Sequence, residues 1–246
     1  MKDMTNEVRP TPAKRHTAFA LVMAGLVLVF LSLGTWQVQR LFWKLDLIAR
    51  VDARVHAEAV SAPTPADWPR ITATSDEYRH VTATGTFLND RETLVQAVTE
   101  LGPGFWVLTP LKTADRGTIL INRGFVPAER RDPASRAAGQ TAGETTLNGL
   151  LRLSEPGGAF LRANDPSGNR WYSRDVAAIA AARGLSDVAP YFIDADKTPN
   201  EGGYPVGGLT VIAFRNSHLV YAITWYTLAA MSAGAVVYLL RQRRRA

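Results

Sequence analysis

The chain contains no cysteine among its 246 residues, which excludes a disulfide scaffold, thiolate metal sites and thiol redox chemistry. Common enzyme motifs are absent as well. The sequence has no G-x-S-x-G, H-E-x-x-H, P-loop or Rossmann glycine pattern. It therefore gives no positive evidence for an enzyme.

Charged side chains are missing from two long apolar segments at opposite ends of the chain, residues 18–38 and 218–240. Each segment has about 20 residues, so a helix built from it is roughly 30 Å long and matches the hydrocarbon core of a bilayer. We expect both segments to be transmembrane helices. The fold class predicted is then an α+β membrane protein, with a β-rich extracytoplasmic domain over residues 62–217.

Basic residues gather beside these segments and account for much of the net charge of +6. Arg215 precedes the second segment and four arginines follow it: Arg241, Arg243, Arg244 and Arg245. Such clusters indicate membrane topology rather than a nucleic-acid partner. We expect the tails, residues 1–17 and 241–246, to be cytoplasmic and the middle domain to be periplasmic, in a bacterial inner membrane. The first segment is long for a cleaved signal peptide and lacks its cleavage site, and the acids Asp3 and Glu7 argue against a mitochondrial transit peptide.

The helical pattern of the first segment continues beyond the predicted membrane span. Leu41, Leu45, Ile48 and Val55 keep a helical spacing, with charged residues between them. The pattern predicts an amphipathic stalk helix over residues 39–61. Ala62-Pro63-Thr64-Pro65 should end it.

Residues between the spans follow the period of two that is typical of strands. Strands are expected at 81–87, 105–111, 118–123 and 147–153, with a short one at 191–194, and Gly124 should end the third. One helix is predicted between Asp175 and Arg183, with Ser173 as its N-cap. Residues 127–144 have no period and are expected to form a long loop. Many short strands favour a small twisted sheet or a partly open barrel.

The candidate binding site lies where the second span begins. His218, Tyr221 and Trp225 stand at i, i+3 and i+7, so a helix puts them on one face. A neutral imidazole can ligate a metal, aromatic rings can hold a flat macrocycle, and Arg215 can pair with carboxylates. Together they suit a haem with His218 as axial ligand to its iron. The alternative is that these residues form an ordinary interfacial belt without a ligand.

A second aromatic and basic cluster marks the end of the first span. Trp36 and Arg40 share a helix face there and should lie at the same membrane surface as His218. They are candidates to frame the same cofactor from the other side, with snorkelling belt residues as the alternative. Asp194 and Asp196 could bind a divalent cation, but solvated acids at a strand end are commoner. His80 is expected to be structural.

Five blocks of this sequence resemble the Surfeit locus protein 1 family of cytochrome c oxidase assembly factors, and they occur in the family's order. The blocks are LGTWQVQRLFWK at 33–44, YRHVTATGTF at 78–87, GPGFWVLTPL at 102–111, INRGFVP at 121–127 and NSHLVYAITWYTLA at 216–229. Residues 128–145 and 155–170 do not match clearly. The resemblance covers most of the chain between residues 33 and 229.

The resemblance implies a chaperone that binds haem a transiently and helps to insert it into the catalytic subunit of cytochrome c oxidase or a related terminal oxidase. It carries the haem-linked histidine onto His218 and the tryptophan near it onto Trp225. Partners implied are that subunit, membrane lipid and the haem a synthesis machinery. A scaffold that stabilises the nascent subunit without a cofactor is the alternative. The signature Asn122-Arg123-Gly124 is expected to be structural, with glycine at a positive φ.

Overall fold

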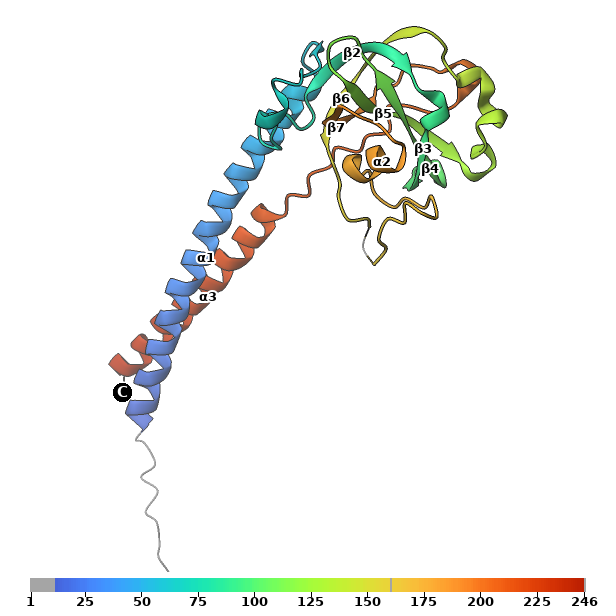
Figure 1. The fold of residues 1–246 in the computed structure, drawn as a ribbon. Coiled ribbons are helices and arrows are strands. Elements are labelled where there is room, and N and C mark those ends of the chain that lie inside the picture. The colour runs from blue at the N-terminus through green and yellow to red at the C-terminus, as the bar shows by residue number, and fades with distance from the viewer. Residues whose placement is uncertain (1–11, 160, 246) are drawn as a thin grey trace, which may run out of the picture. The chain divides into compact units, whose positions relative to one another are not determined.

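The computed structural model describes residues 12–159 and 161–245 (Figure 1). The chain divides into two compact units, a helical unit of residues 1–49 and 213–246 and a second unit of residues 50–212. Of the predicted tails, residues 1–11 and 246 lie outside the described residues.

The helical unit contains two helices that are long and apolar enough to cross a membrane. They are α1 (Pro12–Val55) and α3 (His218–Arg245). Most of their large apolar side chains are exposed: Leu21 by 70%, Leu28 by 68% and Met231 by 67%. A core helix of a soluble protein would bury such residues. Their exposure agrees with two helices made for an apolar solvent.

Helix α1 continues without a break past the predicted span but ends at Val55, short of the predicted stalk end at residue 61. The prediction fails there because contacts from elsewhere in the chain capture the next residues. The carbonyl oxygen of Ala57 lies 2.9 Å from Nδ1 of His80. Val60 and Ser61 then form β1 (Val60–Ser61), which pairs in parallel with β2 (His80–Phe87).

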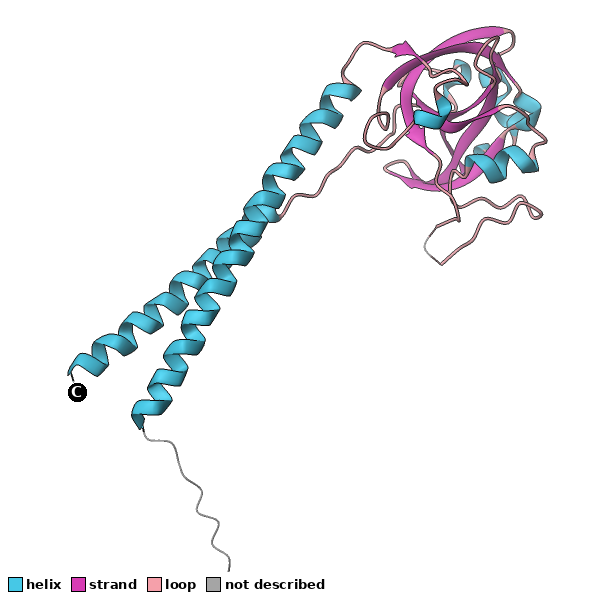
Figure 2. Cartoon of the chain, turned by 60° about the vertical axis from the view of Figure 1, so that its left-hand side comes forward, coloured by secondary structure: helices cyan, strands magenta, loops and turns pink. Residues whose placement is uncertain are grey.

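The second unit is built on a seven-stranded sheet in the order β1-β2-β6-β7-β5-β4-β3. An additional pairing of β2 with β4 closes β2, β6, β7, β5 and β4 into a ring, drawn in magenta in Figure 2. Closure pairs both sides of the five ring strands and leaves only β1 and β3 as edges among the described strands. The remaining strands are β3 (Thr93–Thr99), β4 (Gly102–Lys112), β5 (Thr118–Pro127), β6 (Glu144–Leu153) and β7 (Val188–Ala195).

Two hydrophobic clusters stabilise this barrel. The first lies inside and includes Val81, Ala83, Ile121 and Tyr191, all buried. Val81 and Ala83 alternate with more exposed threonines on β2, so the predicted period of two is confirmed. The second cluster lies between the strands and α2 (Val176–Ala182), where Ile179 is fully buried.

Several local predictions are corrected by the structure. The N-cap of α2 is Asp175, whose carboxylate accepts from the amide of Ala178, and not Ser173. Gly124 does not end β5, which runs on to Pro127. No prediction covered β3, and Gly102-Pro103-Gly104 belongs to β4, which pairs with it. The long loop contains two short 3-10 segments, Ala128–Arg130 and Pro133–Gly139; others are Trp68–Arg70, Asn89–Arg91 and Glu201–Gly203.

Candidate functional site

Helices α1 and α3 pack through one narrow stripe of residues each. Along α3 the less exposed positions His218, Ala222, Trp225, Ala229 and Ser232 alternate in steps of four and three. The same steps occur on α1 at Phe30, Gly34, Gln37, Leu41 and Lys44. This spacing keeps a seam facing its partner helix, as in a coiled coil. We call these ten residues the helix seam.

Small and aromatic residues set the close approach at the seam. A Cβ atom on Gly34 would lie 2.8 Å from the ring of Tyr226, so only glycine fits there without a shift. The hydroxyl oxygens of Thr35 and Tyr226 lie 3.2 Å apart. Phe30 stacks on Trp225 with ring centroids 5.7 Å apart. Aromatic stacking therefore holds one level of the seam and a glycine contact the next.

The polar contact of the seam joins His218 to Gln37. Nδ1 of His218 lies 2.7 Å from Oε1 of Gln37, whose residue is only 9% exposed. An amide oxygen can only accept, so in this arrangement Nδ1 carries a proton, and in the neutral tautomer the lone pair is then on Nε2. The backbone N–H of His218 donates to Oδ1 of Asn216 at 3.3 Å, which fixes the start of α3. No other described residue bonds the imidazole, so Nε2 is the nitrogen open to a ligand.

The other predicted site residues do not all join this contact. Trp225 lies in the seam, whereas Tyr221 is 54% exposed. Trp36 is half exposed, and Arg40 lies with its Cζ 4.6 Å from the ring centroid of Trp43. The predicted meeting of Trp36 and Arg40 with His218 is therefore absent from the described contacts. Arg215 is exposed, on the segment that leads into α3.

Trp36 and Arg40 do not reach His218 because they lie on a face of α1 that is turned away from the helix seam. Trp36 precedes Gln37 by one residue and is turned about 100° away from the seam, and Arg40 follows it on the same face. Gln37 is thus the site residue that sequence reasoning missed. The signal was present as an amide inside an otherwise apolar span, in step with Gly34 and Leu41.

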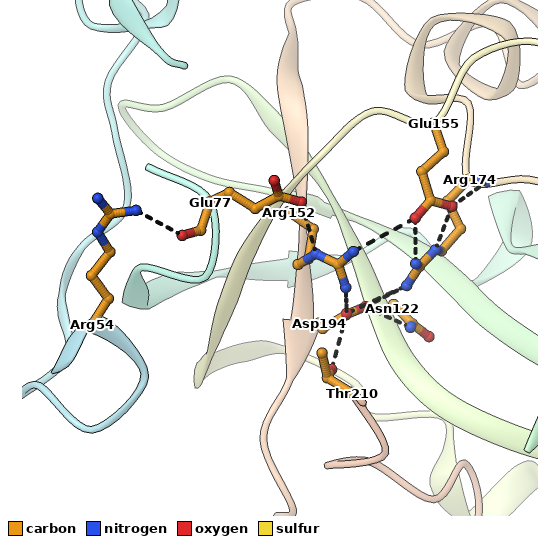
Figure 3. A network of polar contacts seen from close by, with 8 residues as sticks. All are labelled: Arg54, Glu77, Asn122, Arg152, Glu155, Arg174, Asp194 and Thr210. Atoms are coloured by element: carbon orange, nitrogen blue, oxygen red, sulfur yellow. Dashed lines mark hydrogen bonds and ion pairs between the residues drawn. The ribbon is translucent and has the colours of Figure 1, made fainter. Parts of the chain in front are cut away.

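A second polar cluster lies on the outer face of the barrel (Figure 3). Asp194 is 3% exposed, so the expectation of a solvated acid is wrong. Four side chains donate to its carboxylate, at 2.7 to 3.1 Å: Asn122, Arg152, Arg174 and Thr210. Burial lowers the pKa of Arg174, but its contacts with Asp194 and Glu155 outweigh burial and raise it. Because the guanidinium groups already bond the carboxylate oxygens, we infer that this cluster stabilises the barrel and does not bind a metal cation.

The signature Asn122-Arg123-Gly124 has a structural part, as predicted. Oδ1 of Asn122 accepts from the amide of Gly124 at 3.2 Å, while its Nδ2 donates to Asp194 at 2.7 Å. Gly124 has φ +127°, and a Cβ there would lie 2.1 Å from the carbonyl oxygen of Val206. A side chain is therefore excluded both by conformation and by space.

His80 links three parts of the second unit. Nδ1 contacts the carbonyl of Ala57, and Nε2 lies 2.8 Å from Oδ2 of Asp196. Burial lowers the pKa of His80, but the bonds to the carbonyl and the carboxylate outweigh it and raise the pKa. Two acceptors facing two nitrogens favour the imidazolium. Within the described residues, no group of three His, Cys, Asp or Glu side chains could hold a metal ion.

Comparison with known proteins agrees with this architecture. The model of the SURF1 family matches residues 24–230, which includes the whole barrel and every residue of the helix seam except Ser232. The chain is 38% identical to Surfeit locus protein 1 of Homo sapiens, over 92% of this chain and 79% of that protein. It is 39% identical to the SURF1-like protein of Monosiga brevicollis, over 94% and 90%, and 41% identical to Surfeit locus protein 1 of Rattus norvegicus, over 82% and 69%. With a match that spans both helices and the domain between them, this chain belongs to the SURF1 family.

Proposed function

We propose that this protein is an assembly factor for a haem-copper terminal oxidase, cytochrome c oxidase or a relative. In this role it binds haem a and assists its insertion into the catalytic subunit. Family membership supports the oxidase role. The observation that carries the haem role is the contact of Gln37 with Nδ1 of His218, which leaves Nε2 of the imidazole unbonded among the described residues.

The residues at the start of α3 fit a haem. Haem a supplies an iron that accepts an imidazole nitrogen as axial ligand. His218 would hold it through Nε2, while Trp225 and the exposed ring of Tyr221 supply aromatic surface. Arg215 would pair with a propionate. Trp36 and Arg40 belong to the outward face of α1 and would serve at the margin of the site or toward a partner. A single histidine ligand is suited to a cofactor that must be passed on.

The test of the haem role is spectroscopic. The chain is produced together with haem a synthesis, purified in detergent, and compared with His218→Ala and with His56→Ala. His56 is a matched control because it is an exposed histidine just after α1 whose bonds, among the described residues, go to Asp52 of that helix. We expect haem a spectra in the wild type and in His56→Ala, and loss or a shifted spectrum in His218→Ala. An unshifted, full haem complement in His218→Ala rules out the ligand assignment.

A scaffold without a cofactor is the second candidate. The observation that favours it is the row of exposed aromatic side chains on α1, Trp36, Phe42 and Trp43, which a partner's transmembrane helix could cover. In that case no purified variant carries haem, and the catalytic subunit still co-purifies with the wild type. Trp36→Ala combined with Trp43→Ala should then release the subunit, while His218→Ala retains it.

We also propose a bacterial inner-membrane location, with both termini cytoplasmic and the barrel periplasmic. The exposed apolar surface of both helices and the arginines at the C-terminal end of α3 support this. Because the chain has no cysteine, an introduced one is its only thiol. In intact spheroplasts, a membrane-impermeant maleimide should label Glu100→Cys and spare Gln242→Cys. The opposite labelling would reverse the topology.

A further inference from the structure

A cavity of about 730 Å³ lies at one mouth of the barrel. It is bounded by the ends of β2, β5, β6 and β7 and by residues 137–142 and 198–201. Its size falls in the range of small-molecule sites in proteins. Its walls carry many hydroxyl and amide groups, among them those of Gln140, Thr141, Thr145, Asn148 and Asn200.

Arg123 of β5 forms part of this wall and is only 3% exposed. Its Nη2 donates to Asn200 at 3.1 Å, to Thr141 at 3.4 Å and to the carbonyl of Gly139. Its Cζ lies 4.7 Å from the ring centroid of Phe87. Thr141, Asn200 and Phe87 all line the cavity too, so the guanidinium lies at the cavity wall.

Two donors in this wall lack a partner. Nη1 of Arg123 and Nε2 of Gln140 are both buried and make no hydrogen bond to any described residue. A buried donor without an acceptor costs about 1–3 kcal/mol, and more when it is charged. Both donors require hydrogen-bond acceptors, so a ligand that satisfies them must itself carry acceptor atoms.

The charge of Arg123 is also uncompensated at short range. No carboxylate of the described residues lies within ion-pair distance of it; the nearby Glu92 is held by both terminal nitrogens of Arg136. The pKa of Arg123 is lowered to about 10, mainly by burial; the charge of Glu92 opposes this and the charge of Arg136 adds to it. A buried cation without a bonded counter-ion is destabilising.

Two acids line the cavity as well, and neither supplies the missing partner. Asp196 lies 2.8 Å from Nε2 of His80 and is bonded there rather than to Arg123. Glu201 is exposed, where water screens its charge. The positive charge next to the two unpaired donors therefore remains available to a ligand.

We propose that this cavity binds an oxyanion group, a carboxylate or a phosphate, with Nη1 of Arg123 and Nε2 of Gln140 as its donors. A guanidinium presents donors in a fixed fork that matches both groups. The site is separate from the helix seam and does not depend on the haem role.

The test compares the melting temperature of the full chain in detergent in sodium chloride, sodium acetate and sodium phosphate at one ionic strength. We expect a saturable rise in acetate, phosphate or both relative to chloride; acetate alone identifies a carboxylate site and phosphate alone a phosphate site. Gln140→Leu should weaken the apparent affinity by about tenfold, the effect of losing one hydrogen bond to a charged group. Arg131→Gln is the control, because Arg131 is exposed, stacks on Phe105 and lies outside the cavity.

A second measurement covers the case in which a variant does not fold. Arginine side chains labelled with ¹⁵N in the wild type should show one resonance, that of Arg123, moving during the titration. Equal melting temperatures in all three salts, or an unchanged response in Gln140→Leu, would overturn the proposal.

Discussion

Replacing Asp194 by asparagine should destabilise the barrel strongly, because it removes the only buried charge between two arginines. Arg152 and Arg174 approach its carboxylate at 3.0 and 3.1 Å, and their side chains are 13% and 14% exposed. Breaking a buried ion pair on one side costs about 3–5 kcal/mol. Glu155 still contacts both arginines and is 37% exposed, so the lower end, about 3 kcal/mol, is expected.

For a chain of this size, 1 kcal/mol shifts the melting temperature by about 2–4 °C, so Asp194→Asn should lower it by about 6–12 °C. Tryptophan fluorescence is a suitable probe, because Trp171 is 1% exposed in the core that α2 covers. Asp90→Asn is the matched control, since Asp90 is 79% exposed and lies 3.9 Å from Arg91. A shift of under about 2 °C in Asp194→Asn would refute the reasoning, and would mean that water or Glu155 compensates the arginines fully.

Three further changes test other parts of the chain. Gly34→Leu should push the Tyr226 ring away from α1 and lower the melting temperature. Gly25→Leu is the control and should not lower it, because a Cβ at Gly25 would meet nothing within 4 Å. Gln37→Leu should reduce the Nδ1–H tautomer of the seam histidine in ¹⁵N–¹H imidazole spectra of the haem-free protein; an unchanged tautomer would exclude the amide as its cause. Because bonds to a carbonyl and a carboxylate raise the pKa of His80, its stabilisation is complete below its ordinary pKa of 6.5 and is lost as pH rises through the higher folded value. Melting temperature should therefore fall more between roughly pH 6 and 8 in the wild type than in His80→Gln, and parallel curves would contradict this.

Sequence alone predicted the elements whose signal is local. The two apolar segments lack charge over a bilayer's length, and β2 alternates residue by residue, so both were found. The end of α1 was wrong because His80, over twenty residues later, takes the carbonyl of Ala57. Local periodicity carries no information about such a contact.

In the candidate site, the sequence indicated His218 but not its partner Gln37. His218 stands at the start of an apolar helix and is visible as the histidine at that boundary, directly after Arg215-Asn216-Ser217. Its partner is harder to find, because a helix that is apolar on all sides does not indicate which stripe faces another helix. Sequence analysis marked Asp194 as a possible cation ligand and Arg123 as part of a signature but did not find their bonding partners, because the fold, and not proximity in the chain, places those partners beside them.

The contact between Gln37 and His218 joins residues 181 positions apart. At about 5–20 residues per second, a ribosome needs about 10–40 s to make the chain between them. During that interval the amide of Gln37 has no seam histidine to bond. Every strand of the barrel is synthesised before His218. The helix seam is therefore completed only after the barrel has been made, and the haem site that we propose at His218 could form no earlier.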